Sequence, residues 1–157
     1  MKNLLFLLLV LTVFGSTVPA QKKVAISLDG KSWKADLHSA QVTKLLNKIF
    51  LKIEFTEGKE ELSFEIDLGK IKGKKEADLV YKPMKRMSDP PPAFTVSYMK
   101  DEKNKWNASE GTLKITSFDE GKKLISGELD IKLSKKGASD GQTKQLKGKF
   151  ENINFSE

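Results

Sequence analysis

The 157-residue sequence contains no cysteine, and this absence removes several kinds of chemistry and stabilisation. No disulfide can hold the fold together, and neither thiol catalysis nor a cysteine-ligated zinc site can be built. The sequence offers no cysteine for lipid attachment at a mature N-terminus either. We therefore expect a fold that depends on side-chain packing alone.

Histidine is almost as scarce, because His38 is the only one. A single histidine excludes a metal site built from several histidines. Asp36 and His38 have the spacing of a strand face, and such a pair can act as a general base, but it is more typical of a solvated surface. Carboxylate pairs such as Glu65 with Asp67 stand at outward positions beside lysines, where ion pairing is expected rather than glycoside hydrolysis. We predict no catalytic residues, no metal site, no cofactor and no enzyme activity.

Long hydrophobic runs are missing except near the N-terminus, where residues 4–14 are apolar. Lys2 precedes this run and Val18-Pro19-Ala20 follows it, which is the order of an export signal and its cleavage site. The run is shorter than the roughly 20 residues that cross a bilayer. We expect a signal peptide at residues 1–20 and a single β-domain at residues 21–157. The domain should be secreted or periplasmic, with no transmembrane segment after cleavage.

The charges are unbalanced, since 28 lysines and arginines oppose 21 aspartates and glutamates. A formal net charge of +7 draws an exported protein toward anionic surfaces, and it also serves plain solubility. Nucleic acid is an unsuitable partner, because the lysines alternate with acidic residues instead of forming one basic stripe. Solubility is the simpler explanation of the charge and leaves the partner unknown; the partners that the charge allows are an anionic envelope polymer and a protein.

Apolar and polar side chains alternate over most of residues 24–155, which is the period of β-strands. Asp29-Gly30 lies between two such runs and predicts a tight hairpin turn. Further hairpins are predicted over residues 49–68 and 111–133. About eight to ten short strands predict an all-β fold, either a single antiparallel β-sandwich or a β-barrel. The predicted inward side chains include Leu62, Phe64, Ile66, Leu129, Ile131 and Phe150.

Interruptions of the alternation predict local irregularities. The last strand changes parity after Phe150, which predicts a bulge near Glu151-Asn152. Gly127, inside a strand, predicts a bulge, a bend or a close backbone approach. Residues 39–50 carry apolar side chains at helical spacing, so a short helix and a strand are both open there. The proline-rich segment 81–94 is expected to be a loop or a sheet edge.

Four motifs follow one another in order: ISLDGKSWKA at 26–35, GTLKIT at 111–116, ISGEL at 125–129 and KGKFENI at 147–153. In this order they resemble a family of uncharacterised exported β-domains that is common in the Bacteroidota and includes many lipoproteins. The resemblance implies an all-β extracytoplasmic domain and transfers no catalytic residues. The chain lacks the lipoprotein cysteine of many members, so we expect it to be soluble or held by a partner.

Functional residues are expected in the connections, because rigid β frameworks carry variable function on loops. Tyr81, Lys85 and Arg86 lie in the proline-rich segment, and Trp106 stands in a polar stretch where a core role is hard to explain. These four are the candidate binding-loop residues. The sequence predicts an exported, non-enzymatic β-domain that binds a partner or supports the envelope. The alternative is a lipocalin-like carrier of a small apolar ligand, which requires a continuous apolar cavity of about several hundred Å3.

Overall fold

The computed structural model describes residues 23–45, 47–135 and 141–157, and these form ten β-strands and one short 3-10 helix. The all-β prediction is confirmed. The expected signal peptide at residues 1–20 lies outside the described residues. The elements are β1 (Lys23–Leu28), β2 (Lys31–Trp33), β3 (Asp36–Leu45), β4 (Lys48–Glu57), β5 (Glu60–Asp67), η1 (Leu68–Lys70), β6 (Ala77–Val80), β7 (Phe94–Asp101), β8 (Asn104–Asp119), β9 (Leu124–Lys135) and β10 (Thr143–Asn154).

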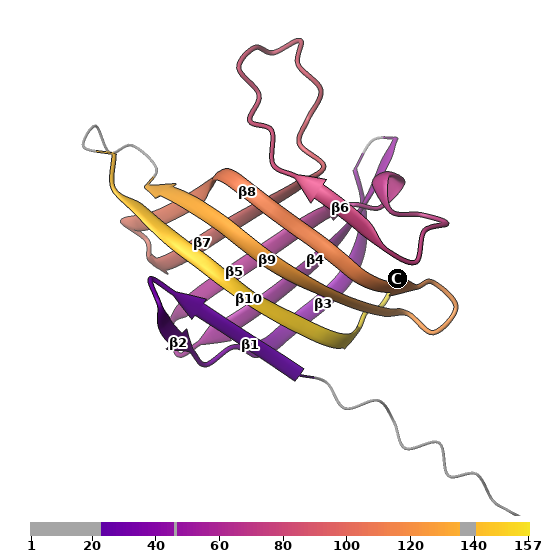
Figure 1. Cartoon of the computed structure of the whole chain (residues 1–157), viewed down its shortest axis with the longest axis horizontal. Helices are drawn as coiled ribbons and strands as arrows, with labels where there is room; N and C mark the ends of the chain where they lie inside the picture. The colour runs from indigo at the N-terminus through magenta and orange to yellow at the C-terminus, as the bar shows by residue number, and fades with distance from the viewer. Residues whose placement is uncertain (1–22, 46, 136–140) are drawn as a thin grey trace, which may run out of the picture.

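The ten strands of the described residues belong to one antiparallel sheet, which curls strongly into a barrel-like shape (Figure 1). The order across the sheet is β2-β1-β10-β9-β8-β7-β5-β4-β3, and β6 pairs with β8. Most neighbours in this order follow one another in the chain, whereas β1 pairs with the last strand, β10. The single curled sheet is barrel-like and not a sandwich of two sheets.

The curled sheet is linked at two places where its edge strands, β2 and β3, meet other parts of the chain. In β3 the amide of Val42 donates to the carbonyl of Ser156 at 2.7 Å, and the amide of Ser156 donates to the carbonyl of Ala40 at 3.0 Å. At the end of β2 the indole Nε1 of Trp33 donates to the Glu60 carboxylate at 3.1 Å. These bonds use polar groups that would otherwise stay unpaired at the edges of the sheet.

Aromatic and branched aliphatic side chains fill the inside of the curl. The rings of Phe55, Phe64 and Phe150 are fully buried there. The centroid of the Phe64 ring lies 5.8 Å from that of Phe55 and 6.3 Å from that of Phe150. The two-residue period of the sequence thus identified the core correctly, because the other predicted inward residues are also buried: Leu62, Ile66, Leu129 and Ile131.

The predicted turn and bulge have the backbone geometry that they require. Asp29 and Gly30 have φ angles of 52° and 76° between β1 and β2, as a type I′ hairpin turn needs. The register of β10 against β9 shifts between Phe150 and Ile153, where the sequence predicts the bulge. A Cβ on Gly127 would lie 2.7 Å from Cζ of Phe150. It would also lie 2.9 Å from the backbone carbonyl oxygen of Lys114, so the close backbone approach is confirmed. The predicted irregularity is confirmed as well, because the register shifts next to Gly127 in its pairing with both β8 and β10.

The sequence left a helix and a strand open for residues 39–50, and the structure shows residues 39–45 and 48–50 in strands. β3 and β4 pair from Asp36 opposite Thr56 to Leu45 opposite Lys48. This long pairing satisfies backbone groups that a short isolated helix would leave exposed, so tertiary context outweighs the helical spacing of the apolar residues.

Candidate functional site

An open cavity of about 650 Å3 lies at the end of the barrel where the β3–β4 and β8–β9 turns, η1 and the C-terminus meet. It is the right-hand end in Figure 1. Its size is suitable for a small ligand, since ligand pockets range from about 300 to 1,000 Å3. Four segments line this end cavity: Val42, Lys44, Asn47, Lys48 and Ile49; Asp67, Leu68, Gly69, Lys70 and Lys72; Phe118, Glu120 and Lys123; Phe155 and Glu157.

Apolar side chains form the floor of the end cavity. The buried rings of Phe118 and Phe155 stack with their centroids 5.8 Å apart and their planes 14° from parallel. Val42 and Leu68 also line the cavity, and both pack against the core. The amide of Phe155 donates to the carbonyl of Lys123 at 3.0 Å, which fixes the C-terminal ring beside the β8–β9 turn. The floor therefore offers an apolar ligand a surface that is continuous with the core.

Lysines surround this floor, and three of them have no acidic partner among the described residues. The Nζ atom of Lys48 lies 3.6 Å from Oδ2 of Asp67, and Lys123 forms an ion pair with Glu157. The lining holds five lysines and three carboxylates, so positive charge is in excess by two. The lysines without an ion pair in the described residues are Lys44, Lys70 and Lys72.

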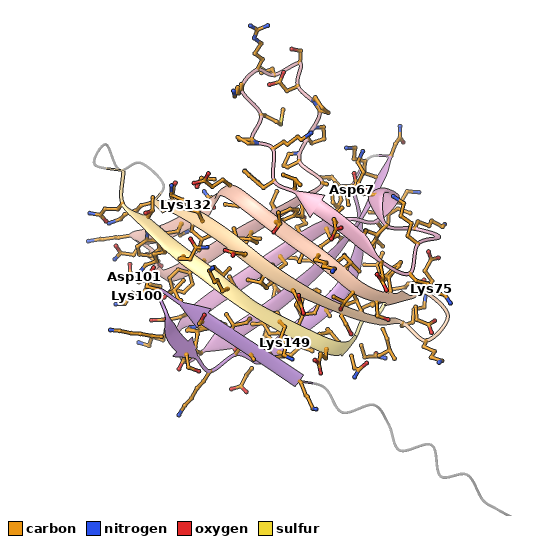
Figure 2. All side chains as sticks on the ribbon, viewed as in Figure 1. Asp67, Lys75, Lys100, Asp101, Lys132 and Lys149 are labelled. Atoms are coloured by element: carbon orange, nitrogen blue, oxygen red, sulfur yellow. The ribbon has the colours of Figure 1, made fainter. Side chains whose placement is uncertain are left out.

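Asp67 shapes one wall of the end cavity. The alternation of the sequence places Asp67 with Glu65 at outward positions beside lysines, and the lysine neighbour is confirmed by the ion pair with Lys48. The expected solvent exposure is wrong, because Asp67 is only 6% exposed. Its Oδ1 accepts the amide of Gly69 at 2.9 Å and caps η1, while its Oδ2 faces Lys48. A cap satisfies a backbone donor at the start of a helix. Asp67 thus joins η1 to the β3–β4 hairpin, near the top right of Figure 2.

The end cavity offers apolar side chains, lysines and carboxylates. His38, the only histidine of the sequence, is exposed on β3 and does not line the cavity. Within residues 23–45, 47–135 and 141–157, no three histidine or acidic side chains gather in a geometry that could hold a metal ion. The cavity combines an apolar floor with ammonium groups, an arrangement that suits a molecule with an apolar body and an anionic group.

Three of the predicted binding residues lie in the segment that projects from the barrel between β6 and β7 (Figures 1 and 2). The amides of Lys85 and Arg86 donate to one carboxylate oxygen of Asp89, at 2.8 and 2.9 Å. This tight turn leaves both basic side chains exposed. Tyr81 packs at the base of the segment, where its ring centroid lies 5.8 Å from that of Phe94 and burial raises the pKa of its hydroxyl. The structure therefore brings Lys85 and Arg86 together, while Tyr81 supports the segment.

Trp106 lies elsewhere, and its expected place in a loop is wrong. It is a buried residue of β8, and its ring centroid lies 5.5 Å from that of Tyr98. The Nζ atoms of Lys144 and Lys135 lie 5.0 and 5.7 Å from the centre of the indole ring. These cation–π contacts explain how a strand of polar appearance holds a core tryptophan. Trp106 is at the opposite end of β8 from Phe118, so it does not reach the end cavity.

Sequence reasoning missed the end cavity, because its lining comes from segments that are far apart in the chain. The one local signal is the lysine-rich connection after β5, which contributes Lys70 and Lys72. That signal indicates a basic surface, but it does not indicate the buried phenylalanines beneath it.

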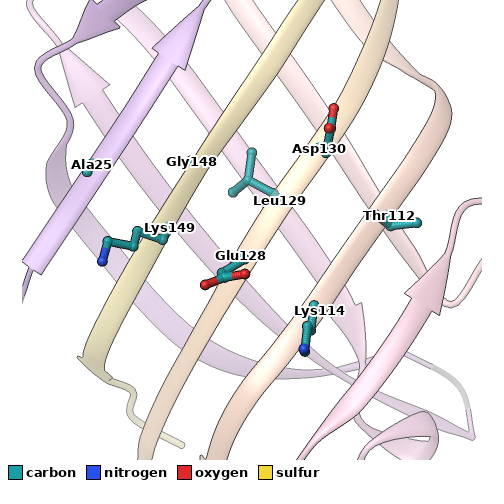
Figure 3. Close-up of a pocket in the computed structure, with 8 residues that line it drawn as sticks. All are labelled: Ala25, Thr112, Lys114, Glu128, Leu129, Asp130, Gly148 and Lys149. Carbon is teal, nitrogen blue, oxygen red and sulfur yellow. The ribbon is translucent and has the colours of Figure 1, made fainter.

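A second hollow, of about 470 Å3, lies on the outer face of the sheet across β1, β10, β9 and β8 (Figure 3). Lys149, Glu128 and Lys114 stand opposite one another on three adjacent strands, so positive and negative charges alternate. Asp130, also in the lining, pairs with Lys147 at 2.9 Å. Alternating charges favour no ligand of one sign and are typical of a solvated sheet face. We therefore assign no site to this hollow.

Comparison of the chain with models of protein families, with curated proteins and with solved structures finds no match. The resemblance to exported β-domains of the Bacteroidota therefore stays a prediction. In the described part of the chain, no helix has the length and apolar character needed to cross a membrane. The fold and the site define a barrel-like all-β domain with a lysine-lined cavity at one end.

Proposed function

We propose that the protein is an exported, non-enzymatic binding domain that holds a small amphipathic anion in its end cavity. The observation that carries this proposal is the placement of Lys44, Lys70 and Lys72, which have no ion-pair partner in the described residues, around an apolar floor. An apolar tail gains roughly 25 cal/mol for each Å2 buried against Phe118 and Phe155. An acidic head group gains charge-assisted hydrogen bonds from the ammonium groups.

This proposal differs from a carrier that encloses its ligand along the whole barrel. Phe55, Phe64 and Phe150 occupy the centre of the curl, so a ligand lying there would have to displace them. The lipocalin-like alternative therefore takes the form of an apolar ligand held in the end cavity alone. The excess of lysines in the lining favours an ionised ligand over a neutral one.

Export is supported by the sequence ahead of the domain, where an apolar run is followed by a small-residue cleavage site. A location in the periplasm or outside the cell places the domain near anionic envelope components. The full chain has a net charge of +7, and the domain without Lys2 keeps +6, which favours association with such components or with an acidic protein partner.

Fluorescence displacement with decanoate and with 1-decanol tests the ligand class, because the two ligands share one apolar chain and differ in charge. The wild type should bind decanoate at least about tenfold more tightly than decanol, which corresponds to about 1.4 kcal/mol. Equal affinity for the two ligands would contradict the proposal of an anionic ligand. Binding of neither would contradict the proposal as a whole.

Two triple variants with the same change in charge separate a local effect from a general one. K44Q/K70Q/K72Q removes the unpaired lysines of the end cavity and should abolish the preference for decanoate. K100Q/K103Q/K105Q neutralises three exposed lysines around the β7–β8 turn and should keep the preference. Lys100 is labelled at the other end of the barrel in Figure 2. Loss of the preference in both variants would show that net charge, and not the end cavity, selects the ligand.

A further inference from the structure

The exposed large hydrophobic side chains of the described residues are gathered on two projections. They have exposed fractions from 43% to 100%, and Met87 is the fully exposed one. Two of them belong to the β3–β4 hairpin, and three belong to the segment between β6 and β7 or to its base. Figure 1 shows both projections extending from the same side of the barrel. The residues are Leu45, Ile49, Val80, Met84 and Met87.

Asp67 connects the two projections. Its amide donates to the carbonyl of Ala93, at the end of the β6–β7 segment, at 2.9 Å. Its carboxylate lies 3.6 Å from the Nζ atom of Lys48, in the β3–β4 hairpin. Both projections therefore start from one buried point of the barrel. We call their surface the projecting face, which consists of residues 44–45, 47–49 and 80–93.

The projecting face is basic as well as apolar. It contains five basic side chains and one carboxylate, that of Asp89, which gives a net charge of +4. The carboxylate of Asp89 accepts the amides of Lys85 and Arg86, so it shapes the turn at the tip. Met87 follows directly after these two basic residues. The tip thus presents a fully exposed methionine next to two cations. The five basic residues are Lys44, Lys48, Lys82, Lys85 and Arg86.

The prolines of the segment support this presentation. Pro90-Pro91-Pro92 form the return from the tip to β7. Consecutive prolines favour an extended and stiff backbone, so the tip is held away from the barrel at a low entropic cost. A segment that is already ordered loses little freedom when it meets a surface.

We propose that the projecting face docks the protein on an anionic lipid bilayer. Met84 and Met87 would enter the head-group region, and Lys85 and Arg86 would lie at the lipid phosphates. Apolar side chains that are exposed together with basic ones are the features of proteins that bind at a membrane interface. A soluble anionic polymer would engage the cations but would leave the methionines in water, so a bilayer matches both properties of the face.

This inference goes beyond the proposed function and does not depend on it. Four residues belong both to the projecting face and to the lining of the end cavity: Lys44, Asn47, Lys48 and Ile49. Docking would therefore bring the mouth of the end cavity to the lipid surface.

Vesicle flotation tests the docking. Wild-type protein should float with vesicles of equal parts phosphatidylcholine and phosphatidylglycerol, and it should stay in solution with phosphatidylcholine alone. K85Q/R86Q should lower the affinity for the anionic vesicles about thirtyfold, because each basic residue near an anionic surface contributes about fivefold. K100Q/K103Q, the control with the same charge change, should stay within about twofold of the wild type at physiological salt, where distant charges are screened.

Insertion of the tip is tested separately from charge. M87W places an indole at a fully exposed position, where the substitution does not disturb the core. Its fluorescence should shift to shorter wavelength with anionic vesicles and be quenched by brominated lipid, whereas Trp33 and Trp106 are already buried. M87S should weaken vesicle binding about tenfold, through the loss of apolar burial.

Three results would overturn the docking proposal. One is equal flotation in either of two comparisons: the wild type with neutral against anionic vesicles, or the wild type against K85Q/R86Q with anionic vesicles. Another is vesicle binding of M87W without a spectral shift or quenching, which would indicate a purely electrostatic contact, as with a soluble polyanion. The third is an equal loss of binding in K100Q/K103Q. Decanoate affinity should be unchanged in K85Q/R86Q, because neither residue lines the end cavity. Vesicle flotation therefore tests docking, and decanoate affinity tests ligand binding, each without depending on the other.

Discussion

Replacing Glu60 by alanine should destabilise the end of the barrel that lies opposite the end cavity, because hydrogen bonds between β2, β5 and β7 are lost. The Glu60 carboxylate accepts the hydroxyl of Tyr98 at 2.6 Å and the indole Nε1 of Trp33 at 3.1 Å. Both aromatic side chains are buried, and their rings make an edge contact with the centroids 6.5 Å apart. Each buried donor left without an acceptor costs about 1–3 kcal/mol. Glu60 is only half-buried, so water can take over part of the hydrogen bonding that its carboxylate provides. We therefore expect Glu60→Ala to lower the free energy of unfolding by about 2–4 kcal/mol.

Urea denaturation, followed by circular dichroism, measures this loss. A double-mutant cycle of Glu60→Ala with Tyr98→Phe should give a coupling energy of about 1–3 kcal/mol. Glu61→Ala is the matched control, because Glu61 is the next carboxylate along β5 and its side chain makes none of these bonds. A loss below about 0.5 kcal/mol for Glu60→Ala, which is typical of an ordinary surface site, would refute the reasoning. So would a coupling energy near zero.

Two further predictions concern the core and the alkaline limit of stability. Phe64→Ala should lower the free energy of unfolding by about 3–5 kcal/mol in urea denaturation, because it leaves a cavity at a fully buried site between the rings of Phe55 and Phe150. Near-wild-type stability would contradict the assignment of Phe64 to the inward face of the sheet. Burial and the hydrogen bond to Glu60 raise the pKa of Tyr98, so the folded protein retains this proton after the unfolded chain has lost it. The associated stability is complete below about pH 10, the unfolded pKa, and falls above it. Tyr98→Phe should flatten this fall in urea midpoints, and an unchanged slope would contradict the assignment.

Strands and turns were predictable because their signals are local. Alternation over residues 51–66 and 111–133 placed the inward side chains correctly, since a strand directs successive residues to opposite faces. Ile49, at the end of the same alternation, is instead 43% exposed. Asp29-Gly30 identified its hairpin because few residue pairs adopt two successive positive φ angles. No local signal indicates that β1 pairs with β10 or that Ser156 bonds to β3, because such contacts depend on how far the sheet curls.

The contrast between local signals and long-range contacts also explains which candidate residues were placed correctly from the sequence. Lys85 and Arg86 were placed in a loop correctly because prolines and charges mark a loop within one short segment, while their binding role stays a prediction. Trp106 was misplaced because the lysines that cover its ring come from β9 and β10, which no reading of its own neighbourhood reveals. Asp67 was expected to be solvated because alternation does not show that a short helix, capped by Asp67, begins where the strand ends.

The two ends of the barrel differ in how their polar groups are satisfied, and the proposed binding site lies at the end with fewer internal bonds. At one end the Glu60 carboxylate takes up the donors of two buried aromatic residues, so little is left over for a ligand. At the other end the buried rings of Phe118 and Phe155 lie beneath lysines that lack an ion pair in the described residues. The hydrogen bonds of Glu60 close one end of the barrel, whereas the opposite end keeps an open cavity and lysines without an ion pair in the described residues. The proposed ligand binding depends on this second set of properties.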